Sequence, residues 1–146
     1  MLIREEQQVA LDKVAVLALK NSDHYESEAE RVSPDLALFF RSLAARRKTF
    51  AGQLAEILRR TGELPSEPDR DREVVEEVIT RLRTFLASDR EAELLQEREK
   101  GESELAEAVE QALQFRLPRE TVDLLHGFSR HIEETRTRLQ QYRGRS

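Results

Sequence analysis

Apolar residues recur every three or four positions along this chain, and its four prolines fall between those runs. The prolines are at positions 34, 65, 68 and 118. A 3–4 spacing places side chains on one face of an α-helix, and proline is tolerated at the start of a helix but not in its interior. No Asn-Gly pair or alternating β-branched run indicates a hairpin. The sequence therefore predicts an all-α fold.

Cap and turn residues divide the chain into five helical segments. Ser33-Pro34-Asp35 supplies an N-cap, a proline for the first helical position and an acidic first turn. Gly62 and Pro65 end that helix, and Leu117-Pro118 ends a later one. Ser88-Asp89-Arg90-Glu91 has the form of a capping box. We predict helices over about 2–32, 34–61, 71–87, 89–116 and 119–143.

Four of these segments carry an apolar stripe long enough to pack into a shared core. The stripes are Leu11, Val14, Ala18, Tyr25 and Val32; Leu36, Phe40, Leu43, Phe50, Leu54 and Ile57; Leu95, Leu105, Val109 and Ala112; and Val122, Leu125, Ile132 and Leu139. Long helices joined by short turns and one longer crossover are typical of an antiparallel four-helix bundle. We expect residues 71–87 to add a short helix along that crossover, and residues 1–146 to form a single domain.

Composition removes several classes of function. The chain has no cysteine, which excludes thiol catalysis and cysteine-ligated metal. Its net charge is −5 and its only compact basic cluster is Arg46-Arg47-Lys48, so we expect no nucleic-acid partner. The longest run without a charge, 49–55, is far too short to cross a membrane. The opening MLIREEQQ does not resemble a secretory signal, and we expect a cytoplasmic protein.

Polar residues interrupt the apolar stripes on all four long helices. Continuing each 3–4 register places the following residues inward: Asn21, Glu28, Arg47, Arg98, Glu102, Ser129 and Arg136. A buried charge must be paired, hydrated or bound to a metal, because an isolated one is too costly. The simplest solution is an interior ion-pair network made of Glu28, Arg47, Arg98, Glu99, Glu102 and Arg136.

A metal centre is the alternative, and it has a recognisable pattern. Di-iron bundles use a glutamate from each of two helices and a Glu-x-x-His motif from each of the other two. This chain has one Asp-x-x-His, Asp123 to His126, and no Glu-x-x-His. We expect no metal or other cofactor; should iron or another divalent metal bind, the candidate ligands are His24, Glu28, Glu99, Glu102 and Glu133. The more ordinary expectation for His24 is a surface or half-buried hydrogen bond.

The order of these segments resembles a family of bacterial ferritin-like four-helix-bundle proteins of unknown function. The resemblance covers nearly the whole chain. It is carried by YESEAERV at 25–32, LFFRSLAARRKTFAGQLAEIL at 38–58, SDREAELLQEREKGESELAEAVEQAL at 88–113 and RLQQYR at 138–143. It implies a ferritin-like fold, but fold alone does not imply an activity.

The same resemblance implies that the metal site of ferritin-like relatives is degenerate here. Glu99 and Glu102 match glutamates of the family, whereas Arg136 stands where the family has a histidine. Arg46, Arg47 and Lys48 stand where a ferritin-like second helix would offer an acid and a histidine. An arginine cannot ligate iron, so the resemblance implies an Arg–Glu network in place of a di-iron site.

Two classes of function follow from these expectations. The first is a bundle without enzymatic activity that acts through its surface, as a homodimer or as a protein-interaction module, including a stress-associated one. The second is a ferritin-like protein that binds or oxidises iron. No catalytic residue is predicted, since no nucleophile motif or phosphate-binding loop occurs. An exposed apolar patch around Phe39 would favour a protein partner.

Overall fold

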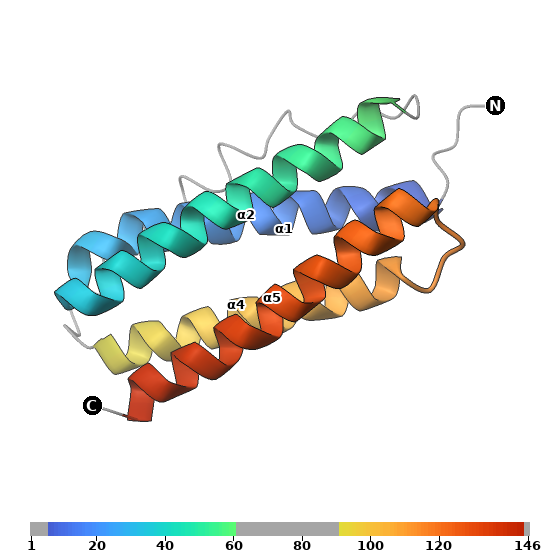
Figure 1. Ribbon diagram of the computed structural model, residues 1–146. Helices are drawn as coiled ribbons and strands as arrows, with labels where there is room; N and C mark the ends of the chain where they lie inside the picture. Colours follow the sequence, from blue (N-terminus) through green and yellow to red (C-terminus); the bar gives the residue numbers. More distant parts are fainter. Residues whose placement is uncertain (1–5, 61–90, 145–146) are drawn as a thin grey trace.

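The structure, a computed structural model, describes residues 6–60 and 91–144, which form four long α-helices (Figure 1). The predicted all-α bundle is confirmed for these residues. The crossover helix expected at 71–87 lies outside them. The helices are α1 Glu6–Glu28, which a short 3₁₀ turn η1 Ala29–Arg31 follows, α2 Pro34–Arg60, α4 Glu91–Ala112 and α5 Arg119–Gly144.

Local sequence explains where the helices begin and end. Pro34 is the first residue of α2, and the carbonyl of Ser33 accepts the first helical hydrogen bond from the amide of Ala37 at 2.8 Å. Helix α4 ends at Ala112 and not near residue 116 as the sequence suggested. The physical reason is a tightened last turn, in which the Phe115 amide donates to the Ala112 carbonyl at 3.2 Å.

Each helix runs antiparallel to the two helices that it packs against, and the four helices form a bundle (Figure 1). Helix α1 packs on α2 and α4, and α5 packs on α4 and, more sparsely, on α2 (Figure 1). Helices α2 and α4 therefore lie on one diagonal of the bundle, and α1 and α5 on the other. The loosest of the four sides is the one between α2 and α5.

The apolar core is divided into two clusters along the bundle axis. One contains Leu11, Val14, Leu54, Leu105 and Leu125 together with Phe50 and Phe128, whose rings stack. The other contains Leu36, Phe40, Leu43, Leu95 and Leu139. Buried polar side chains from all four helices occupy the region that joins these clusters. The candidate site lies in this polar layer.

In the part of the chain that the structure describes, every helix is too polar or too short to span a lipid bilayer.

Candidate functional site

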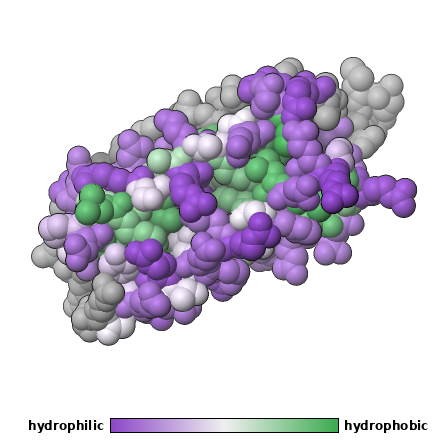
Figure 2. Space-filling model, viewed as in Figure 1, coloured by the Kyte–Doolittle hydropathy of each residue, from purple (hydrophilic) through white to green (hydrophobic). Residues whose placement is uncertain are grey.

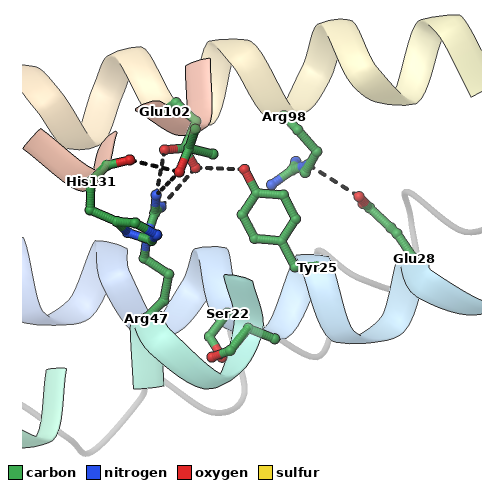
Figure 3. A network of polar contacts seen from close by, with 9 residues as sticks. Ser22, Tyr25, Glu28, Arg47, Arg98, Glu102 and His131 are labelled. Atoms are coloured by element: carbon green, nitrogen blue, oxygen red, sulfur yellow. Dashed lines mark hydrogen bonds and ion pairs between the residues drawn. The ribbon is translucent and has the colours of Figure 1, made fainter. Parts of the chain in front are cut away.

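An ion pair between Arg47 and Glu102 forms the centre of the polar layer (Figure 3). Arg47 comes from α2 and Glu102 from α4, and neither side chain has any exposed surface. Nη1 and Nη2 of Arg47 each donate to one carboxylate oxygen of Glu102 at 2.7 Å. This parallel two-bond geometry is the strongest that a guanidinium and a carboxylate can form.

Helices α1 and α5 complete the same cluster. The Tyr25 hydroxyl, on α1, donates to Oε2 of Glu102 at 2.6 Å. Nη2 of Arg47 also donates to Oγ1 of Thr135, on α5, at 3.2 Å, and that hydroxyl donates to the His131 carbonyl at 2.7 Å. Each of the four helices thus contributes one residue to a single hydrogen-bonded group, and both charges are neutralised inside it. We call Tyr25, Arg47, Glu102 and Thr135 the central network.

A second buried ion pair lies beside the central network, between Glu28 of α1 and Arg98 of α4. Nε of Arg98 is 3.1 Å from Oε1 of Glu28, and both side chains are buried (Figure 3). The two side chains are close but are not aligned for hydrogen bonding. Neither Glu28 oxygen accepts a hydrogen bond from a residue that the structure describes. His24, one turn earlier on α1, has its Nδ1 3.7 Å from the other Glu28 oxygen. The attraction between Glu28 and Arg98 is therefore mainly electrostatic, without the paired hydrogen bonds of Arg47 and Glu102.

Burial and charge together fix the protonation states in the central network. Burial, reinforced by the Glu102 carboxylate, raises the pKa of Tyr25 well above its usual range, so the phenol stays protonated and can donate. Burial by itself would lower the pKa of Arg47, but the paired Glu102 carboxylate raises it on balance. Arg47 therefore stays a cation in this network, and Tyr25 stays a neutral phenol.

His131 borders the central network and faces the gap between α2 and α5. Burial, followed by the charges of Arg47 and Arg46, lowers the pKa of His131 from 6.5 to about 4. The imidazole is consequently neutral at physiological pH. The side chain of His131 is buried.

The fold brings together only part of the network that the sequence suggested. Glu28 and Arg98 form one pair and Arg47 and Glu102 form another, all four in the interior. Glu99 instead reaches toward the surface and pairs with Arg143 at 2.8 Å. Asn21 is buried as expected, with its Oδ1 3.2 Å from where a Cβ on Gly101 would lie.

The inward position assigned to Arg136 belongs to its neighbour Thr135. Arg136 is 35% exposed and pairs with the exposed Glu133 at 3.1 Å. A shift of one residue turns a side chain by about 100° around the helix axis, which moves Arg136 from the interior to the rim. For the same reason Phe128 is buried where the inward residue was expected to be Ser129, which is half-buried.

Sequence reasoning missed three members of the polar layer. Tyr25 was placed in an apolar stripe, and only its hydroxyl hints at a polar partner. Thr135 carried no signal beyond its place next to Arg136. Ser22 of α1, whose hydroxyl donates to the Ala44 carbonyl of α2 at 2.7 Å, is an ordinary small residue in the sequence. His24 is buried, where a surface or half-buried position was expected.

The candidate metal ligands do not converge. His24 and Glu28 lie together, but Glu102 has both oxygens taken by Arg47, and Glu133 lies on the surface. Within 6–60 and 91–144, no group of three or more histidine and acidic side chains is placed to hold a metal ion. The donor set of the described residues, with two arginines among its glutamates, does not fit a di-iron centre.

Comparisons with known proteins identify a protein family for this chain but do not indicate an activity. Residues 13–115 match the family described as Domain of unknown function (DUF2383). No curated protein and no solved structure matches the chain. The match covers most of α1, all of α2 and α4, and the buried residues Tyr25, Arg47 and Glu102. The chain therefore belongs to this family of unknown function.

Proposed function

We propose that this chain is a ferritin-like bundle without enzymatic activity that serves as a structural or protein-interaction module. In this proposal an Arg–Glu network occupies the interior region where ferritin-like proteins bind two irons. The observation that carries it is the Arg47–Glu102 pair, with two bonds of 2.7 Å and no exposed surface on either side chain.

The central network supports this role because it leaves no ligand capacity at its centre. A metal would have to displace Arg47 from Glu102, and a buried guanidinium left without its carboxylate is strongly unfavourable. Tyr25 already donates to the same carboxylate. Glu102 is therefore committed to holding the four helices together.

The surface near the start of α2 supports a role in binding another protein. Leu38 is 68% exposed. The adjacent Phe39 is partly buried and stacks on Tyr142 with ring centroids 5.4 Å apart. The guanidinium of Arg138 lies 4.5 Å from the Phe39 ring centroid. An exposed leucine beside a cation-capped aromatic pair is typical of contact surfaces more than of solvent-only surfaces.

Metal analysis tests the proposal directly. Protein purified without chelator, then incubated anaerobically with ferrous iron and desalted, should contain iron well below one atom per chain. Its thermal midpoint should not change on adding iron, since binding to the folded state would raise it. A content of about two irons per chain would overturn the proposal in favour of iron binding or oxidation.

A further inference from the structure

The loosest side of the bundle carries a groove between α2 and α5. Two adjoining cavities of about 600 and 620 Å³ lie along it, and both are lined by Thr49, Gln53 and Leu124. The stacked rings of Phe50 and Phe128 line one of the cavities. Figure 2, in the view of Figure 1, shows hydrophobic side chains gathered along the line between these two helices and hydrophilic ones on either side. The groove is thus apolar at its base and polar at its rims.

Two glycines face this groove, one from each helix. A Cβ added to Gly52 of α2 would meet nothing within 4 Å, and one added to Gly127 of α5 would meet only the end of Arg130, at 3.8 Å. Glycine inside a helix is less favourable than alanine, and the packing among the described residues gives no steric reason for either glycine. Small residues at such positions instead allow another helix to approach closely.

Helix α2 presents a whole stripe of small side chains along the same groove. Ala45, Thr49 and Gly52 are exposed, line the cavities and follow one another at intervals of four and three residues. That spacing keeps residues on one face and is the seam by which two helices pack side by side. This face of α2 is distinct from the face that enters the bundle core through Phe40, Leu43, Phe50 and Leu54.

Charged residues at one end of the groove form an ion pair across it, and charged residues at the other end do not. At one end Arg60 of α2 and Glu120 of α5 form an ion pair across the groove. Arg46 and Glu134 occupy the equivalent places on α2 and α5 about four helical turns away, or roughly 21 Å. Both line the groove, but neither makes an ion pair with any residue in the described ranges. Within those ranges Arg46 and Glu134 are therefore unmatched, and Arg130 of α5 is a further cation that lines the same cavity.

We infer that a second copy of this chain occupies the groove, in a two-fold dimer whose axis runs along the groove. In this dimer α2 of each copy lies in the groove of the other, with the Ala45–Thr49–Gly52 stripes in contact. Arg46 of each copy then lies beside the Glu134 of the partner copy. The inference rests on the proposed role as an interaction module and identifies its partner as the chain itself.

A second copy suits the groove because it supplies a helix with a small-residue face and charges opposite to those of Arg46 and Glu134. A two-fold interface is self-complementary, so each contact that one copy makes is returned by the other. One copy offers a helix with a small-residue face and, at the matching height, an arginine and a glutamate. Reciprocal Arg46–Glu134 pairs would satisfy both charges at once, as Arg60 and Glu120 already do within one chain.

Charge reversal tests the ion pairs. Sedimentation equilibrium should show a concentration-dependent dimer, and Arg46→Glu should weaken the association about tenfold. The double variant Arg46→Glu/Glu134→Arg should restore it. Arg41→Glu is the matched control, because Arg41 is exposed on α2 and lines neither cavity. A chain that stays monomeric at all concentrations, or a double variant as weak as the single one, would overturn the inference.

Engineered cysteines test the helix contact, since the chain has none of its own. Gly52→Cys should give a disulfide-linked dimer under mild oxidation, and Ser103→Cys, on an exposed position of α4, should not. Dimers that form without cross-linking through position 52 would contradict this arrangement. The metal analysis tests the proposed function independently of the dimer. A protein that binds iron and also dimerises through α2 would refute the proposed function but support the dimer.

Discussion

The guanidinium of Arg47 and the carboxylate of Glu102 meet across the diagonal of the bundle, joining α2 to α4. These helices are not packing neighbours, so the two 2.7 Å bonds are a direct connection between opposite corners. Tyr25 and Thr135 bond to the same pair from the other two corners. Most of the stability changes expected on mutation follow from this geometry.

Glu102→Gln should destabilise the protein by about 3–5 kcal/mol. The substitution keeps the shape of the side chain but removes the carboxylate that is bonded to Arg47, which leaves a buried cation uncompensated. Urea unfolding followed by circular dichroism measures the effect. Glu133→Gln is the control, because Glu133 is an exposed glutamate, and its free energy of unfolding should stay within about 0.5 kcal/mol of the parent.

Removing both charges should cost less than removing one. In the double variant Arg47→Met/Glu102→Leu no buried charge remains, and apolar replacements of similar size often match or exceed a buried ion pair in stability. We expect the double variant to be more stable than Glu102→Leu alone by about 2 kcal/mol or more. Strictly additive losses in this cycle would show that the pair does not act as a unit.

Acid should weaken the fold partly through His131. Its pKa is about 4 in the folded protein and near 6.5 in the unfolded chain, so between these values only the unfolded chain binds a proton there. Stability from this group is fully present above pH 6.5 and is lost as the pH falls toward 4, by up to about 3 kcal/mol.

Comparison with a variant isolates this contribution from that of the carboxylates. The free energy of unfolding of His131→Gln, measured from pH 7 to pH 4, should fall less steeply than that of the parent. His126→Gln, at an exposed position on the same helix, should preserve the parent's slope. Identical slopes for parent and His131→Gln would rule the effect out.

Two helical glycines should respond differently to alanine. Gly52→Ala should raise the free energy of unfolding by about 0.5–1 kcal/mol, because the added Cβ meets open space. Gly101→Ala should gain less or lose stability, because its Cβ would lie 3.2 Å from Oδ1 of Asn21 and 3.5 Å from Nη1 of Arg98. Thermal unfolding at low protein concentration, where association does not contribute, distinguishes the two.

The sequence predicts the fold well because helix boundaries and apolar stripes are local properties. Pro34 begins α2 as expected, and Leu36, Phe40, Leu43 and Leu54 are all buried. The inward charges of α1, α2 and α4 also follow from extending those stripes through Glu28, Arg47 and Glu102.

The details of the site depend on information that periodicity does not hold. On α5 the neighbours Thr135 and Arg136 are both polar, so the pattern cannot decide which of them faces inward. Glu99 and Glu102 lie three residues apart on one side of α4, yet one pairs with Arg143 at the surface and the other with Arg47 in the core. Which partner each glutamate finds depends on how the other helices pack around α4. The residue pattern of one helix does not contain that information.

The central network also limits how the helices can slide along one another. Leucine and valine stripes remain apolar after a shift of one turn, about 5.4 Å, so the two core clusters alone would tolerate misaligned bundles. A buried carboxylate that takes donors from α1 and α2 tolerates no such shift, because a displaced helix would strand a charge or a hydroxyl in the interior. The network thereby favours one alignment of these four helices over alignments shifted by a turn.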